Sequence, residues 1–210
     1  EDENPEASAL EYVGHELPSG RVVTEENAEF LQKGYIGYVR AYAAEGTLLI
    51  EEKCPIDHLT GEPGAKGTSD AVVIRPDPEL IIIDLKFGRG VEVSAEKNRQ
   101  IMTYALGVIR KHDLAEVIKT VRMVICQPRT GDGKPKEWVI SIEDLLAFGK
   151  EITGKAKKIV VFGKDGTATW TQGLPLSPSE KACRFCKAKA TCLALKGFVD
   201  SRMAEVFENL

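Results

Sequence analysis

The sequence predicts an α/β (α+β) fold in which a mixed central β-sheet is flanked by helices. Along the chain, the expected elements run helix, three strands, helix, two strands and helix. The 210 residues suit one domain with at most a small appendage, and hydrophobic residues, at 43%, are enough for a core. Charged residues make up 29%, as is typical of a soluble protein.

The first predicted helix follows an irregular N-terminal segment. Residues 1–22 are polar and contain Pro5 and Pro18, so no regular element is expected there. Thr24 precedes two glutamates, which is a helix start signal. Apolar residues then recur at helical spacing and predict an amphipathic helix over about 25–44.

Short apolar runs predict the five strands at 48–56, 68–74, 80–87, 121–127 and 138–142. The second and third are joined by the turn at 75–78, because its two prolines cannot continue a ladder.

Three further helical segments are predicted. Ser94 is expected to cap a helix over about 95–111. The segment 141–144 has the spacing of a capping box and opens a helix that runs to about 160. Residues 183–197 are expected to be helical after a cysteine-bearing loop.

Charge and motifs exclude several classes of function. The net charge of −4 gives no support for nucleic-acid binding, but residues 181–196 carry five cations and no acid, which is compatible with a local DNA contact or with a solvated basic helix. No secretory signal or membrane-length apolar run is found, so a cytoplasmic protein is expected. No Walker A loop, Ser/His/Asp order or Rossmann fingerprint is present.

An acid–acid–lysine constellation is the main candidate site. Asp84 ends an apolar strand, and Lys86 projects from the same face because side chains alternate along a strand. The turn at 75–78 pairs this strand with the one that carries Asp70, so the two acids are expected to lie together. Two carboxylates suit Mg²⁺, with the Leu85 carbonyl as a further ligand. The alternative is a simple ion pair between Asp84 and Lys86.

Residues around this triplet resemble a known family. Gly67 to Asp70, the Asp84-Leu85-Lys86 triplet, and Gln100 with Tyr104 on one helix face resemble motifs of the RecB-type branch of the PD-(D/E)XK nucleases. Segments GTSDAVVI, IIIDLKFGRGVEVSAEKNRQIMTYALG, CQPR and CRFCKAKATC resemble a phage and prophage group within that branch, over about residues 25–197. The resemblance implies a restriction-endonuclease-like core.

The resemblance also implies a function and roles. Asp70 and Asp84 would bind Mg²⁺ or Mn²⁺, Lys86 would be catalytic, and Gln100 and Tyr104 would position substrate and lysine. The implied activity is that of a deoxyribonuclease, expected to be an exonuclease, in phage or prophage recombination or DNA end processing. Its implied partners are DNA and a phage single-strand annealing protein, in a bacterial or phage-encoded setting. The alternatives are a catalytically inactive DNA-binding or assembly module and a zinc-stabilised interaction domain.

Three segments are expected on this basis: irregular residues 1–22, a nuclease core over 23–178, and a cysteine-bearing helical segment over 179–210. The branch has an N-terminal helix with a His or Glu metal ligand, and we expect this helix and the true N-terminus to precede Glu1. No convincing equivalent is found among the four remaining candidates, His15, Glu51, Glu52 and His58.

Three of the five cysteines form a candidate cofactor site. Cys183, Cys186 and Cys192 lie within ten residues, which argues for an intracellular metal or cluster site and against a disulfide scaffold. Their spacing resembles that of iron–sulfur nucleases of the same branch, including CRISPR adaptation nucleases, which implies a [4Fe–4S] cluster, with Zn²⁺ as the alternative occupant. The three sulfurs are expected to converge on one point. The fourth ligand is expected on the segment that would precede Glu1, in preference to Cys54 or Cys126. The bland alternative is three free thiols.

Overall fold

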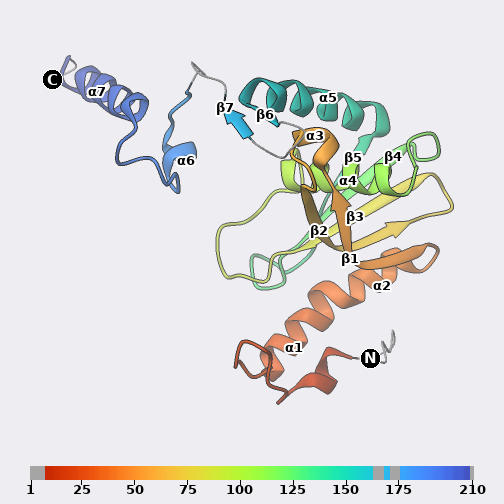
Figure 1. Cartoon of the computed structure of the whole chain (residues 1–210). Coiled ribbons are helices and arrows are strands. Elements are labelled where there is room, and N and C mark those ends of the chain that lie inside the picture. The colour runs from red at the N-terminus through yellow and green to blue at the C-terminus, as the bar shows by residue number, and fades with distance from the viewer. Residues whose placement is uncertain (1–7, 163–167, 171–175, 209–210) are drawn as a thin grey trace. The chain divides into compact units, whose positions relative to one another are not determined.

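The computed structural model describes residues 8–162, 168–170 and 176–208. The chain divides into two compact units, Glu1–Thr169 and Trp170–Leu210. The first unit contains a five-stranded sheet in the order β1-β2-β3-β4-β5 (Figure 1). Its strands are β1 (Thr47–Pro55), β2 (Lys66–Ile74), β3 (Glu79–Leu85), β4 (Thr120–Cys126) and β5 (Lys136–Ser141).

The sheet is mixed, because β3 and β4 run parallel while the other neighbouring strands are antiparallel. Strand β3 is central and almost wholly buried, as its apolar sequence predicts. The predicted α/β fold with a mixed sheet flanked by helices is therefore confirmed, and all five predicted strands lie within two residues of their expected bounds.

Helices cover both faces of the sheet (Figure 1). On one face, α4 (Arg99–Lys111) and α5 (Ile142–Ile159) enclose the larger core, which includes Leu80 and Ile82. On the other face lies one long N-terminal helix made of three segments. These segments are α1 (Glu25–Leu31), the π-helical η2 (Gln32–Ile36) and α2 (Gly37–Ala43).

The structure also contains several short elements. They are the 3₁₀ helix η1 (Ala9–Tyr12), the single-turn α3 (Asp57–Thr60), and a two-stranded sheet of β6 (Val160–Phe162) and β7 (Ala168–Trp170). The sequence pattern predicts neither α3 nor this second sheet. The segment expected to be irregular contains η1, because Ser8 and Glu11 form a capping box there.

The predicted start of the helix at 95 is wrong. Helix α4 begins at Arg99, because the Asn98 side chain accepts hydrogen bonds from the backbone N–H groups of Gln100 and Ile101. Ser94 instead accepts from the Glu96 N–H in the preceding turn. The capping box at the start of α5 is present in part, since the Asp144 N–H donates to Ser141 Oγ at 3.1 Å.

The second unit holds the C-terminal helices α6 (Glu180–Cys183) and α7 (Leu193–Glu208). The helix predicted over 183–197 is wrong for most of its length, because 184–192 forms turns and α7 begins only at Leu193. In the described part of the chain, no helix is long and apolar enough to cross a membrane.

Candidate active site

The register of the sheet brings the two predicted acids together. Ala71 pairs with Ile83 across the antiparallel strands β2 and β3, so Asp70 and Asp84 occupy the next opposed positions. Opposed residues on antiparallel strands project from the same face. Asp70 Oδ2 also accepts a 2.6 Å hydrogen bond from the backbone N–H of Leu85, which fixes its carboxylate beside the end of β3.

Lys86, Gln100 and Tyr104 form a chain of contacts that ends on Asp84. Lys86 Nζ lies 2.6 Å from Asp84 Oδ2 and donates to Gln100 Oε1 at 3.2 Å. The Gln100 amide nitrogen lies 3.4 Å from Asp84 Oδ1 and 3.1 Å from the Tyr104 hydroxyl. The structure thus brings all five predicted side chains into one constellation, and the backbone of Leu85, which follows Asp84, contacts Asp70.

Gly67 lets α4 approach the sheet closely enough to deliver these groups. A Cβ atom built on Gly67 would lie 2.2 Å from Tyr104 Cε1, so only glycine fits opposite the tyrosine ring. Tyr104 in turn holds the Gln100 side chain. The predicted glycine–acid motif therefore has a steric component as well as a carboxylate.

Asp84 is a buried charge with incomplete compensation. Only 4% of the residue is exposed. Burial raises the pKa of its carboxyl, Lys86 opposes this, and the negative charge of Asp70 adds to the increase. Lys86 Nζ lies close to Oδ2, although the pair lacks normal hydrogen-bond geometry. A buried carboxylate is costly unless a positive group compensates its charge, and Lys86 does not fully offset the effect of burial on the pKa of Asp84.

These residues fit a divalent cation of the Mg²⁺ type. Within the described part of the chain, no group of three or more His, Cys, Asp and Glu side chains is arranged to hold a metal ion. Mg²⁺ is commonly held by one or two carboxylates plus water and substrate phosphate, and therefore needs no larger cage. Asp70, Asp84 and the Leu85 carbonyl are the groups that would hold it.

Glu51 is a feature that sequence reasoning left undecided. It lies opposite Asp70, because Ile50 pairs with Ala71. Its φ of 50° is unusual for a residue inside a strand. Leu49 and Cys54 both pack on the α4 side of the sheet although four residues lie between them, so the alternation of β1 reverses around Glu51. Alternation alone could not predict this reversal.

Tyr35 is a second group that sequence reasoning missed. It belongs to the π-helical turn η2 and packs against the core beneath the sheet. Burial raises the pKa of its hydroxyl, and the charge of Asp70 raises it further, followed by Cys126, Glu51 and Asp84. Its hydroxyl therefore lies in the field of the acids. Single π-turns are frequent at functional sites, and Gly34 and Gly37 on either side were the available signal.

The other candidate ligands lie in structural contacts. Glu52 forms ion pairs of 2.7 Å with both Lys111, the last residue of α4, and His112, which caps that helix. His15 stacks edge-on against Tyr12 in the N-terminal segment. His58 lies in α3 beside Asp57, and burial and the charge of Arg110 lower its pKa.

The cysteines do not form the expected group. Cys54 and Cys126 are buried in the sheet, where burial raises their pKa to about 11 and about 12, respectively. In the described residues, Cys183, Cys186 and Cys192 do not come together as a metal-binding set of three. The expected convergence of their sulfurs is therefore not seen in this part of the chain.

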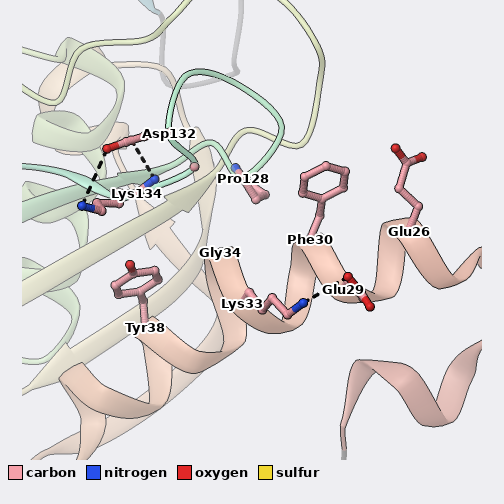
Figure 2. Close-up of a pocket in the computed structure, with 10 residues that line it drawn as sticks. Glu26, Glu29, Phe30, Lys33, Gly34, Tyr38, Pro128, Asp132 and Lys134 are labelled. Carbon is pink, nitrogen blue, oxygen red and sulfur yellow. Dashed lines mark hydrogen bonds and ion pairs between the residues drawn. The ribbon is translucent and has the colours of Figure 1, made fainter.

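A hollow of about 460 Å³ lies apart from this constellation (Figure 2). It is formed by the N-terminal helix and the loop after β4, and it contains none of the predicted site residues. Lys33 pairs with Glu29 and Lys134 with Asp132 inside the hollow, whereas Glu26 pairs with Arg89, which does not line it. None of these contacts suggests a reaction.

Fold and site define an α/β protein with an acid–acid–lysine constellation around the buried Asp84 at one end of a mixed sheet. The chain belongs to the DUF2800 family, described as a protein of unknown function, whose family model matches residues 4–207. Among solved structures, the one described as the crystal structure of SSO0001 matches with 16% identity and a TM-score of 0.34. The match covers 80% of this chain and 68% of that one, and a likeness of this size carries no argument about function.

Proposed function

We propose that this protein is a metal-dependent DNA nuclease. The observation that carries the proposal is the meeting of Asp70, Asp84 and Lys86 at one end of the sheet, where Lys86 Nζ lies 2.6 Å from a buried oxygen of Asp84. A structural ion pair alone would need neither a second acid in the next opposed position nor the Gln100 contact to the lysine.

The constellation suits the hydrolysis of a phosphodiester. In this reaction, the oxygen of a water forms a bond to phosphorus, the bond from phosphorus to one sugar oxygen breaks, and that oxygen receives a proton. Lys86 Nζ would orient the water and stabilise the negative charge that develops on the phosphate oxygens. Gln100 and Tyr104 would keep the lysine in place. A bound Mg²⁺ or Mn²⁺ would polarise the phosphate and make the water a better nucleophile.

The finer expectations rest on the family resemblance. Exonuclease rather than endonuclease action, a role in phage or prophage recombination or DNA end processing, and a single-strand annealing partner are part of this proposal. So is an iron–sulfur cluster or Zn²⁺ on Cys183, Cys186 and Cys192.

A non-catalytic DNA-binding module is the second candidate. The observation in its favour is the 2.6 Å ion pair from Lys86 to Asp84, which neutralises the acid without any metal. A protein that kept the fold but had lost catalysis would retain such a pair.

Cleavage assays separate the two candidates. End-labelled linear DNA and circular DNA are incubated with the wild-type protein and Mg²⁺ or Mn²⁺, alongside Asp84→Asn and Lys86→Ala. The matched control is Asp132→Asn, which changes an exposed acid in the loop after β4. We expect cleavage by the wild type and the control only. DNA binding with no cleavage by any of the four proteins would favour the non-catalytic module.

A further inference from the structure

The chain that follows β4 holds the loop that follows Lys86. The Lys86 backbone N–H donates to the Cys126 carbonyl at 2.8 Å. One residue on, Gln127 is buried, and its side chain bonds the loop twice. Its Oε1 accepts from the Val93 N–H at 2.7 Å, and its Nε2 donates to the Val91 carbonyl at 3.4 Å. Hydrogen bonds thus hold the CQPR segment against the loop after β3 at this end of the sheet.

Arg129 in the same segment has more hydrogen-bond donors than acceptors around it. Its Nη1 donates to the Phe87 carbonyl at the long distance of 3.5 Å, and its Cζ lies 5.0 Å from the centre of the Phe87 ring. Its Nε is buried and makes no hydrogen bond to the described residues. No described carboxylate lies within 4.0 Å of it, in contrast to Arg75 and Arg122, which each pair with acids.

Arg129 follows β4 at the same end of the sheet as the candidate site. Strands β3 and β4 are parallel, and Leu85 pairs with Cys126 at their carboxyl ends. Phe87 and Arg129 therefore follow the ends of the two strands, next to Lys86. Ligands of α/β proteins commonly bind outside the carboxyl ends of the strands. The Arg129 guanidinium therefore has unused N–H donors at this end of the sheet, where an anion could accept hydrogen bonds from them.

We infer that Arg129 binds a backbone phosphate of the substrate DNA, adjacent to the phosphate that is cleaved. The inference rests on the proposed nuclease function and adds a binding residue to it. The guanidinium is planar and matches phosphate oxygens with paired N–H donors, and stacking on Phe87 holds its plane. A phosphate would supply the acceptors that the described residues do not provide.

The test measures DNA binding, independent of cleavage. A labelled DNA duplex is titrated with wild type, Arg129→Gln and Arg129→Lys in EDTA at several salt concentrations. Losing one phosphate contact lowers the slope of log affinity against log salt by about 0.9. We expect this decrease in R129Q, together with weaker binding on every duplex sequence. R129K keeps the charge but not the fork, so its slope should stay near that of the wild type with reduced affinity.

Arg75→Gln is the matched control, because Arg75 is ion-paired at the opposite end of β2 and β3. Its salt slope should equal that of the wild type. A merely structural role for Arg129 would lower the melting temperature of R129Q and leave the slope unchanged, which would overturn the inference. If R129Q does not fold, wild-type affinity in R129K overturns it equally. Retained cleavage with an unchanged R129Q slope would refute the Arg129 assignment alone, whereas a wild type that neither binds nor cleaves DNA refutes both proposals.

Discussion

Asp70 Oδ2 accepts a hydrogen bond of 2.6 Å from the backbone N–H of Leu85, the residue that follows Asp84. A side chain of β2 is thereby fixed to the backbone at the end of β3. The bond orients the Asp70 carboxylate before any ligand arrives, so the constellation is pre-organised.

Asp84→Asn should abolish cleavage without unfolding the protein. Because metal-ion stabilisation of a phosphate is worth several kcal/mol, we expect cleavage to fall by at least ~10²-fold. Mn²⁺ should raise the melting temperature of the wild type and not that of D84N, as scanning calorimetry would measure. The exposed-acid variant Asp132→Asn should behave as the wild type in both assays. Equal Mn²⁺ stabilisation of D84N would show that the metal binds elsewhere.

The difference in stability between the wild type and D84N should depend on pH. Burial raises the pKa of Asp84 in the folded protein, so the folded state binds more protons than the unfolded chain between the ordinary and the raised pKa. Without metal, the contribution of Asp84 to stability therefore falls as the pH rises through that window. Any stability advantage of D84N over the wild type at neutral pH should shrink in acid, measured by urea denaturation. A constant difference across this window would contradict the assignment.

Lys86→Ala should spare metal binding but lower cleavage by ~10²–10³-fold, because the lysine acts on water and phosphate and not on the metal. Calorimetric titration with Mn²⁺ and the cleavage assay measure the two effects separately. Lys97→Ala is the control, since Lys97 is a far more exposed lysine in the same connecting loop. Loss of metal binding in K86A would assign the lysine a purely structural role.

Gly67→Ala should displace Tyr104, because the new Cβ would lie 2.2 Å from the ring. Overpacking of this kind destabilises proteins by ~1–3 kcal/mol. Cleavage should fall as well, since Tyr104 supports Gln100 and thereby Lys86. Gly88→Ala is the control, with no atom within 4 Å of its new Cβ. Equal free energies of unfolding in G67A and G88A would count against the close approach of α4.

Glu52→Gln should make stability less dependent on pH. Burial alone would raise the pKa of Glu52, but hydrogen bonds from Lys111 and His112 hold it below its ordinary value. Its contribution is present above the unfolded-state pKa and is lost as the pH falls through the lower, folded-state pKa. E52Q should lose roughly 1–2 kcal/mol at neutral pH and less in acid, with exposed Glu116→Gln unchanged. Cleavage should persist in E52Q, because Glu52 is paired with Lys111 and His112. Loss of cleavage in E52Q would indicate that Glu52 belongs to the active site.

Anaerobic reconstitution tests the cysteines. The proposal of a cluster expects visible absorbance and bound iron in the wild type, and neither in a variant with Cys183, Cys186 and Cys192 changed to Ser. Zinc analysis of the purified protein covers the alternative occupant. If the protein binds neither iron nor zinc, the proposed cofactor is ruled out. The proposal for Asp70, Asp84 and Lys86 is unaffected by that result.

Local sequence determined much of the fold. Apolar runs fixed the five strands, because burial of one face or both imposes a short period that a single segment already displays. The same period predicted that Lys86 projects from the same face of the sheet as Asp84, because the two residues are two positions apart. The cap of α4 was predicted wrongly at Ser94, because capping depends on the backbone that each residue adopts, and Asn98 is the residue that caps the helix.

Only the tertiary structure decided which side chains meet. The position of Asp70 opposite Asp84 depends on strand register, and the delivery of Gln100 depends on how closely α4 approaches Gly67. The positive φ of Glu51 likewise has no signature in the pattern of its own strand. These relationships join residues far apart along the chain. They are set by pairing and packing across the sheet, which no local period encodes.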